Sequence, residues 1–109
     1  MAVPIYAMTD RYYPVRYGHI GVLSNFAVPV ICRSQKIRDD LVKHCDGMVE
    51  IRPVVGGDMQ MQPFFRKYVK GKVPFCPNAK LIHDNGLYFG NNPELTGQEI
   101  LSIIRLFTA

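Results

Sequence analysis

Apolar and polar positions recur with two different spacings along this chain, and they predict strands and helices in turn. The run NFAVPVI, from Asn25 to Ile31, is mostly apolar on both faces and predicts a strand. Pro29 within it lacks a backbone donor, which favours an edge position or a bulge. Ser34 can cap a helix over residues 35–45, whose apolar positions 37, 41, 42 and 45 form one stripe. Gly47 then offers a stop for that helix.

The second half of the chain predicts shorter elements. In order they are a strand at 48–52 ended by Pro53, a loop at 54–62 with the Gly56-Gly57 pair, a short helix at 64–69 led by Pro63, a loop at 71–78, one helical turn at 79–83 and a strand at 87–90. Thr96 and Glu99 have the spacing of a capping box. They open a last helix with apolar residues at 100, 103, 104 and 107, the spacing of one helical face.

This order of elements predicts an α+β fold. We expect a small sheet of three to four strands, largely antiparallel, with helices on one face. Apolar residues recur with no regular spacing in residues 1–17, which predicts an irregular lead-in whose tyrosines pack on the domain. We expect residues 18–109 to form that domain.

Composition narrows the class of protein. The chain has 109 residues, 48% of them apolar and 20% charged, as in ordinary globular domains. Its net charge of +4 is a mild bias towards anionic ligands, far from that of a dedicated nucleic-acid binder. The three cysteines form no C-x-x-C motif, so we expect free thiols in or near the core. No apolar run is long enough for a membrane span and no leader is evident, which predicts a cytoplasmic protein with no membrane partner.

Two segments carry more polar groups than a purely structural role requires. Glu50 and Arg52 share one strand face just before Pro53 and a glycine loop, as at the mouth of a ligand cleft. There Arg52 could hold a phosphate and Glu50 could accept from sugar hydroxyls, although a simple surface ion pair fits the same pattern. The stretch from 83 to 91 gathers a histidine, an aspartate, two asparagines and a tyrosine hydroxyl around two glycines, although Asn-Gly is also a common turn.

The stretch from Phe64 to Lys72 (FFRKYVKGK) alternates aromatic and basic residues. Such a stretch can form a nucleic-acid or phosphate surface, with rings that stack and cations that neutralise. The pattern fits better with a short helix that places its aromatic rings on the core and leaves its cations in water, because such short stripes are common.

Three segments, taken in order, resemble a known family. SNFAVPV at Ser24–Val30, EIRPVVGGDMQMQPFF at Glu50–Phe65 and PNAKLIHDNGLYFGNNPELT at Pro77–Thr96 resemble the C-terminal small domain of the DegT/DnrJ/EryC1/StrS family. Its members are pyridoxal-phosphate enzymes of the aspartate-aminotransferase fold that act on nucleotide-linked keto-sugars, either as aminotransferases or as 3-dehydratases. The resemblance covers about residues 18–107.

The resemblance implies a fold and a site. It implies a small domain like that of fold type I enzymes, with substrate contacts from Glu50 and Arg52 and further ones from His83, Asn85 and Tyr88. Asp58 stands where the family usually has asparagine, so no ligand role is expected for it. The family's catalytic lysine and its other cofactor-binding residues belong to a large domain, so we expect no catalytic, cofactor-binding or metal-binding residue here and no activity of this chain alone.

The resemblance also implies partners. These are a nucleotide-linked keto-sugar, a large pyridoxal-phosphate-binding domain in cis or in trans, and a second copy in a homodimer, with no role for nucleic acid. The setting would be deoxy- and amino-sugar or surface-polysaccharide biosynthesis. Two alternatives from the residues stay open: a non-catalytic phosphate, nucleic-acid or protein-interaction module, and a purely structural dimer.

Overall fold

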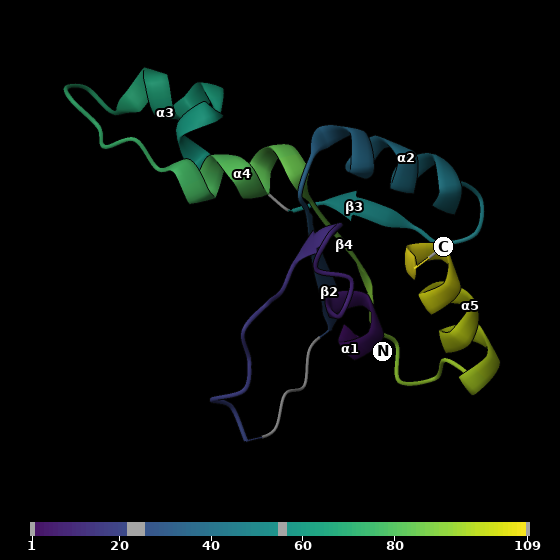
Figure 1. The fold of residues 1–109 in the computed structure, drawn as a ribbon. Helices are drawn as coiled ribbons and strands as arrows, with labels where there is room; N and C mark the ends of the chain where they lie inside the picture. The colour runs from purple at the N-terminus through teal and green to yellow at the C-terminus, as the bar shows by residue number, and fades with distance from the viewer. Residues whose placement is uncertain (1, 22–25, 55–56, 109) are drawn as a thin grey trace.

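Two central strands, β2 (Ala27–Cys32) and β4 (Gly86–Gly90), pair antiparallel over residues 27–31 and 86–90 in the computed structural model of this chain (Figure 1). β1 (Tyr12–Tyr13) pairs with the other edge of β2, and β3 (Ile51–Pro53) with the other edge of β4. The sheet therefore has the order β1-β2-β4-β3 with every pairing antiparallel. The structure describes residues 2–21, 26–54 and 57–108. Asn25 and Gly56, which the sequence placed in a strand and a loop, lie outside those ranges.

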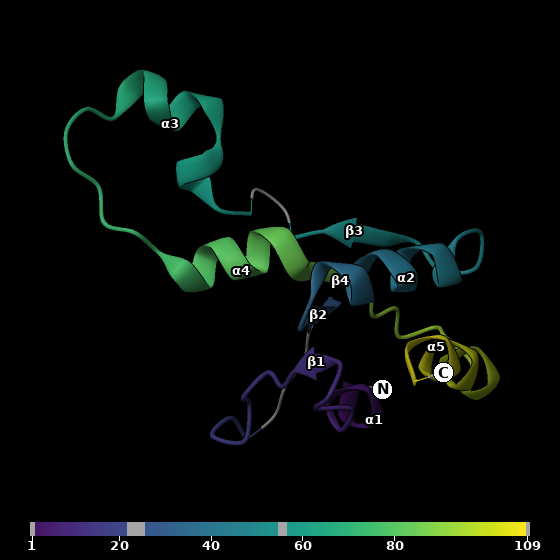
Figure 2. The same cartoon turned by 45° about the horizontal axis from the view of Figure 1, so that its top comes forward.

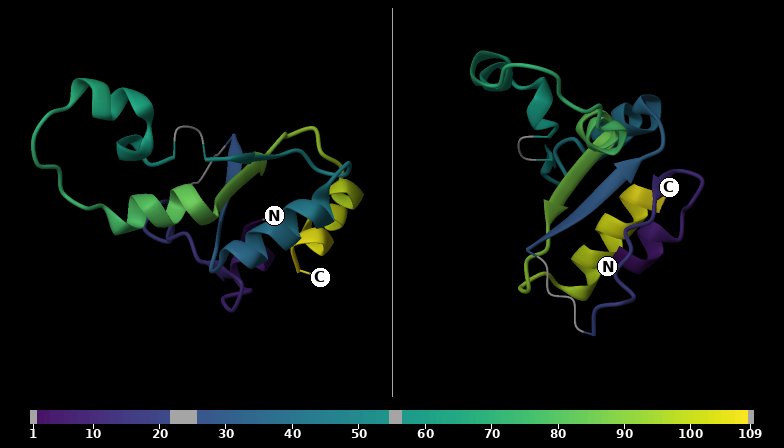
Figure 3. Two further views of the ribbon diagram at one scale, coloured as in Figure 1. Left: turned by 90° about the horizontal axis from the view of Figure 1, so that it is seen from above. Right: turned by 90° about the vertical axis from the view of Figure 1, so that its left-hand side faces the viewer.

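Helices cover one face of this sheet. The described chain has these helical elements: α1 (Ala2–Tyr6), α2 (Gln35–Cys45), the 3₁₀ turn η1 (Met59–Met61), α3 (Pro63–Tyr68), α4 (Pro77–Asn85) and α5 (Gly97–Thr108). Figure 3 shows α1, α2 and α5 together on one side of the paired strands β2 and β4. The predicted α+β class, with an antiparallel sheet and helices on one face, is confirmed.

The core lies between this face and the helices because the strands alternate. Val28, Val30 and Cys32 of β2 are buried, and their partners across the sheet, Phe89, Leu87 and Tyr12, are buried with them. The ring of Phe89 lies 4.8 Å from that of Phe107, centroid to centroid, which attaches α5 to the sheet. The other described core residues are Ile5, Leu41, Cys45, Ile103 and Phe107. The free thiols of Cys32 and Cys45 are buried as predicted, and burial raises the pKa of Cys32 to about 11.

Local signals set the ends of the two long helices as the sequence predicts. The Oγ atom of Ser34 accepts from the backbone N–H of Ile37 at 3.2 Å, which caps α2. Gly47 has a φ of 75°, the left-handed conformation that ends a helix. Thr96 and Glu99 each accept from the other's backbone N–H, at 3.2 and 3.3 Å, and form the predicted capping box at the start of α5.

Pro29 lies at a position of β2 that has no strand on one side. β1 pairs only with Ile31 and Cys32, so it does not reach Pro29. The carbonyl of Pro29 accepts instead from the hydroxyl of Tyr6 at 2.6 Å. Because the nitrogen and carbonyl of a strand residue point to the same edge, the missing N–H of Pro29 costs the sheet no hydrogen bond. The predicted edge position is confirmed locally, although β2 is a central strand.

The prediction that residues 1–17 are irregular is wrong for part of that segment. Residues 2–6 form α1, and Tyr12 and Tyr13 form β1. The helix has no periodic signal because it is five residues long, and tertiary packing stabilises it: Ile5 and Tyr12 are 0% and 1% exposed. The predicted packing of a tyrosine on the domain is confirmed at Tyr12.

Three boundaries differ from the predicted ones. The strand expected at 48–52 begins only at Ile51, because the backbone N–H groups of Met48 and Val49 donate to the carbonyl of Cys45 and close α2. The loop expected at 54–62 contains η1, which the side chain of Asp58 caps. The helical turn expected at 79–83 is the nine-residue α4, because Pro77 occupies its first turn and starts it earlier.

Residues 57–76, which contain η1 and α3, project from the sheet and are called the arm below. Figure 2 shows α3 well apart from the strands, joined to them through α4. The molecule measures 52 × 35 × 27 Å, and its radius of gyration is 15.7 Å. A compact chain of this length would have a radius of gyration of about 13 Å. The arm therefore leaves much of its own surface uncovered.

Tyr12 offers a test of the packing. Its hydroxyl donates to the carbonyl of Phe107 at 2.6 Å, one of the last-turn carbonyls of α5 that have no partner within the helix. Tyr12→Phe should lower the free energy of unfolding by about 1 to 3 kcal/mol, because it leaves a buried carbonyl unpaired. Tyr13→Phe, which removes a hydroxyl from the other face of the sheet, should change it by less than about 0.5 kcal/mol. Urea unfolding measures both, and equal effects would contradict the role assigned to Tyr12.

The same tyrosine predicts a pH dependence. Burial raises the pKa of Tyr12 from 10.0 to about 12. Burial and the neighbouring Tyr17 do the same for Tyr6. The unfolded chain loses these two phenol protons at a lower pH than the folded chain does. The contribution of the two tyrosines to the free energy of unfolding is therefore complete below pH 10 and is lost as the pH rises towards 12. Unfolding midpoints measured across this interval should fall less steeply in Tyr12→Phe than in the unmodified chain. Parallel curves would show that Tyr12 does not contribute.

Candidate functional site

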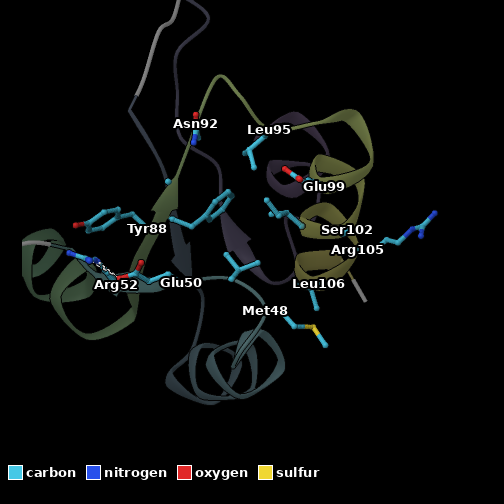
Figure 4. Close-up of a pocket in the computed structure, with 14 residues that line it drawn as sticks. Met48, Glu50, Arg52, Tyr88, Asn92, Leu95, Glu99, Ser102, Arg105 and Leu106 are labelled. Atoms are coloured by element: carbon cyan, nitrogen blue, oxygen red, sulfur yellow. Dashed lines mark hydrogen bonds and ion pairs between the residues drawn. The ribbon is translucent and has the colours of Figure 1, made fainter.

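A crevice of about 1070 Å³ separates the β3–β4 edge of the sheet from α5 (Figure 4). Its floor is apolar, with Phe89 and Ile103 from the core and Val49, Leu95 and Leu106 beside them. Its lining also includes polar residues of both walls. Apolar hollows with a few polar groups at the edge are typical of small-molecule sites.

Three of the five predicted site residues meet at one side of this crevice. Glu50 precedes β3, Arg52 lies within it, and Tyr88 of β4 is the direct cross-strand partner of Arg52. The sheet brings them together because residues two apart on one strand, and residues opposite each other on two, share a face. That face is the one the helices leave open.

Arg52 and Glu50 form an ion pair. The Nη2 and Nε atoms of Arg52 donate to one carboxylate oxygen of Glu50, at 2.6 and 2.9 Å. This hydrogen bond and the charge of Glu50, with a smaller contribution from Tyr88, raise the pKa of Arg52. Both side chains are well exposed, so the pair adds little to stability. Figure 4 shows the side chains of Arg52 and Tyr88 extending away from α5, so they border the crevice on the open face of the sheet.

This arrangement can bind and orient a ligand. It combines a planar cation, a carboxylate and a phenol, which recognise phosphate oxygens and hydroxyl groups. The cation and carboxylate are held in register by two hydrogen bonds and are accessible to solvent.

His83 lies elsewhere, at the base of the arm. Its Nδ1 atom accepts from the backbone N–H of Asp58 at 3.0 Å. Gly57 has a φ of 61°, and a Cβ atom on it would collide with the imidazole ring of His83. The side chain of Asp58 is buried and accepts from the backbone N–H of Gln60 at 3.0 Å. In this structure His83 therefore fixes the start of the arm and does not line the crevice.

Asn85 does not line the crevice either. It is the last residue of α4, and Gly86 begins β4 directly after it. Gly86 has an ordinary negative φ, but it packs so closely on the carbonyl of Ile82 that a Cβ atom would not fit. The Asn-Gly pair thus marks a direct change from helix to strand, which the turn interpretation of these two residues did not foresee.

The far wall supplies residues that the sequence did not indicate as site residues. Asn92, Glu99, Ser102 and Arg105 line it together with Leu95. Ser102 and Arg105 lie on the exposed side of an amphipathic helix, where polar residues are ordinary. Glu99 was recognised only as a helix cap. The sequence holds no signal for them, because they approach the crevice only when α5 packs on the sheet.

The residues present do not fit pyridoxal phosphate. A lysine that forms a Schiff base is activated by burial or by a cationic neighbour in a closed pocket. All six lysines, at 36, 43, 67, 70, 72 and 80, lie within the described ranges and are exposed. Two of them form surface ion pairs, Lys36 with Asp40 and Lys80 with Asp84. No group of three or more His, Cys, Asp or Glu side chains among the described residues is placed to hold a metal ion.

No protein-family model, curated protein or solved structure matches this chain. In the portion of the chain that the structure covers, no helix combines the length and apolar character needed to cross a membrane.

The base of the arm can be tested with two glycines. Gly57→Ala should be destabilising for two reasons, the left-handed backbone and the collision with His83. Gly71 has a φ of 95°, and no described atom beyond its chain neighbours lies within 4 Å of the place its Cβ would take. Gly71→Ala should therefore lower the free energy of unfolding by only about 1 to 2 kcal/mol, the cost of a left-handed backbone. Unfolding measurements should therefore rank Gly57→Ala as the more destabilising, and the amide NMR signals of Asp58 and Gln60 should shift only in that variant. An equal ranking would show that His83 does not pack on Gly57.

Proposed function

We propose that this chain forms one wall of a nucleotide-sugar site in a pyridoxal-phosphate-dependent sugar aminotransferase or 3-dehydratase, as its sequence resemblance implies. The observation that carries the proposal is the meeting of Glu50, Arg52 and Tyr88 beside the crevice. These residues come from two segments of the sequence that are up to 38 positions apart, and each belongs to a motif on which the resemblance rests.

The chemistry of the three side chains suits such a ligand. The guanidinium of Arg52 can donate to two oxygens of a diphosphate in its planar geometry. The carboxylate of Glu50 accepts from sugar hydroxyls, and the hydroxyl of Tyr88 can donate or accept. The crevice beside them has a volume of about 1070 Å³, just above the usual range of small-molecule sites, roughly 300 to 1,000 Å³.

The role proposed for this chain is positioning. The cofactor chemistry would occur on a separate large domain, in cis or in trans, because the lysines here are exposed. Holding the sugar in one orientation accelerates a reaction because it removes the entropy cost of alignment from the chemical step. This chain would therefore determine which sugar is presented.

Replacement of Arg52 tests this site. In an NMR titration with a nucleoside-diphosphate hexose, Arg52→Ala should weaken binding by about tenfold or more, because a charge-assisted pair of hydrogen bonds is lost. Arg52→Lys keeps the charge but loses the planar guanidinium, so its affinity should lie between those of Arg52→Ala and the unmodified chain. Lys70→Glu, a charge change on the arm, should leave the affinity nearly unchanged at moderate salt. If Lys70→Glu weakens binding as much as Arg52→Ala, the diphosphate is attracted by net charge and the proposed site is wrong.

A further inference from the structure

Most of the net positive charge of the protein lies on the arm. Arg66, Lys67, Lys70 and Lys72 are its cations, and the sequence has no acidic residue between Asp58 at its base and Asp84. Asp58 is the one acidic residue of the arm, so the arm carries a net charge of +3, whereas the nine basic and eight acidic residues of the rest of the chain leave a net charge of +1. Three of the four net positive charges therefore lie on one projecting segment of 20 residues.

The same segment exposes large apolar side chains. Phe64, Tyr68 and Phe75 are 50%, 71% and 75% exposed. The aliphatic and thioether residues exposed with them are Met59, Met61, Val69 and Val73. Large exposed apolar patches are typical of interaction surfaces.

The arm is nevertheless held in a defined conformation. Besides the contact of Asp58 with His83, the side-chain amide of Gln60 donates to the carbonyl of Pro74 at 3.0 Å. This bond joins the two ends of the arm. A surface that is ordered before it binds loses less conformational entropy on association.

We propose that the arm is a docking surface for a protein partner that presents an apolar groove bordered by carboxylates. The cations would pair with the carboxylates while Phe64, Tyr68 and Phe75 enter the groove. Buried aromatic anchors within a complementary charged rim are the usual source of affinity in protein interfaces. This inference does not depend on the nucleotide-sugar site, since it uses none of the residues of that site.

The composition of the arm favours a protein over other anionic partners. Single-stranded nucleic acid binds by stacking its bases on aromatic rings and pairing its phosphates with cations. Such binding leaves the exposed side chains of Met59, Met61, Val69 and Val73 without a partner. A lipid surface favours a longer amphipathic helix, whereas α3 has six residues and the arm outside α3 and η1 has irregular backbone with polar groups to satisfy. The arms of two copies would repel each other, and the rest of a second copy has no net negative charge to attract them.

The test is an NMR titration of the ¹⁵N-labelled full chain with a short synthetic peptide that has leucines at helical spacing and glutamates at its other positions. We expect shifts confined to residues 57–76 and binding about tenfold tighter than that of a peptide of equal charge with serine in place of leucine. Phe64→Ser combined with Tyr68→Ser should weaken binding by about tenfold, and so should Lys67→Glu combined with Lys70→Glu. These side chains are exposed, so thermal unfolding should confirm that both variants fold.

Controls separate this proposal from the others. Arg52→Ala should bind the leucine-glutamate peptide as the unmodified chain does, so failure of the sugar site leaves this result unchanged. Equal binding of the serine peptide, or no binding of either peptide, would overturn the proposal. So would tighter binding to oligothymidylate or to vesicles of phosphatidylcholine and phosphatidylglycerol. Light scattering that showed a dimer lost in the Phe64→Ser, Tyr68→Ser variant would assign the arm to a second copy instead.

Discussion

The antiparallel pairing of β2 with β4 is the constraint on which the rest of the molecule depends. Its register places Val28 opposite Phe89 on the helix side and Pro29 opposite Tyr88 on the open side. A shift of one residue would exchange the two faces, exposing Phe89 and burying the hydroxyl of Tyr88. Phe89 in turn contacts Phe107, which holds α5 against the sheet. Both walls of the crevice therefore follow from this one register.

The two surfaces with a chemical character lie on different parts of this framework. The crevice is part of the sheet and α5, and its dimensions suit a small molecule. The arm lies beyond α4, which runs into β4 without an intervening loop (Figure 1). His83, near the end of α4, holds the first residues of the arm, so the orientation of the arm is fixed by the same helix that leads into the central strand. A small ligand and a macromolecular partner could then be bound without competition.

The N-terminal segment shows how far local signals extend. α1 and β1 carry no periodic pattern, yet Ile5 and Tyr12 are among the most buried residues of the described chain. Tyr12 also satisfies a carbonyl at the end of α5, 95 residues away in the sequence. A five-residue helix cannot stabilise itself, so it forms only because the core accepts it. No reading of residues 1–17 by themselves could predict this, because the partner that stabilises them is at the other end of the chain.

The sequence by itself determined whatever depends on neighbouring residues. Spacings of a few positions predict the helix caps at Ser34 and Thr96, the helix end at Gly47 and the helices that these residues delimit. The same short-range spacings predict the α+β class and the shared face of Glu50 and Arg52. Only the tertiary structure decided what depends on residues far apart. It placed Tyr88 beside Arg52, separated His83 and Asn85 from them, and brought Ser102 and Arg105 to the opposite wall. Strand register and helix packing are set by the fit of the whole core, which no local pattern contains.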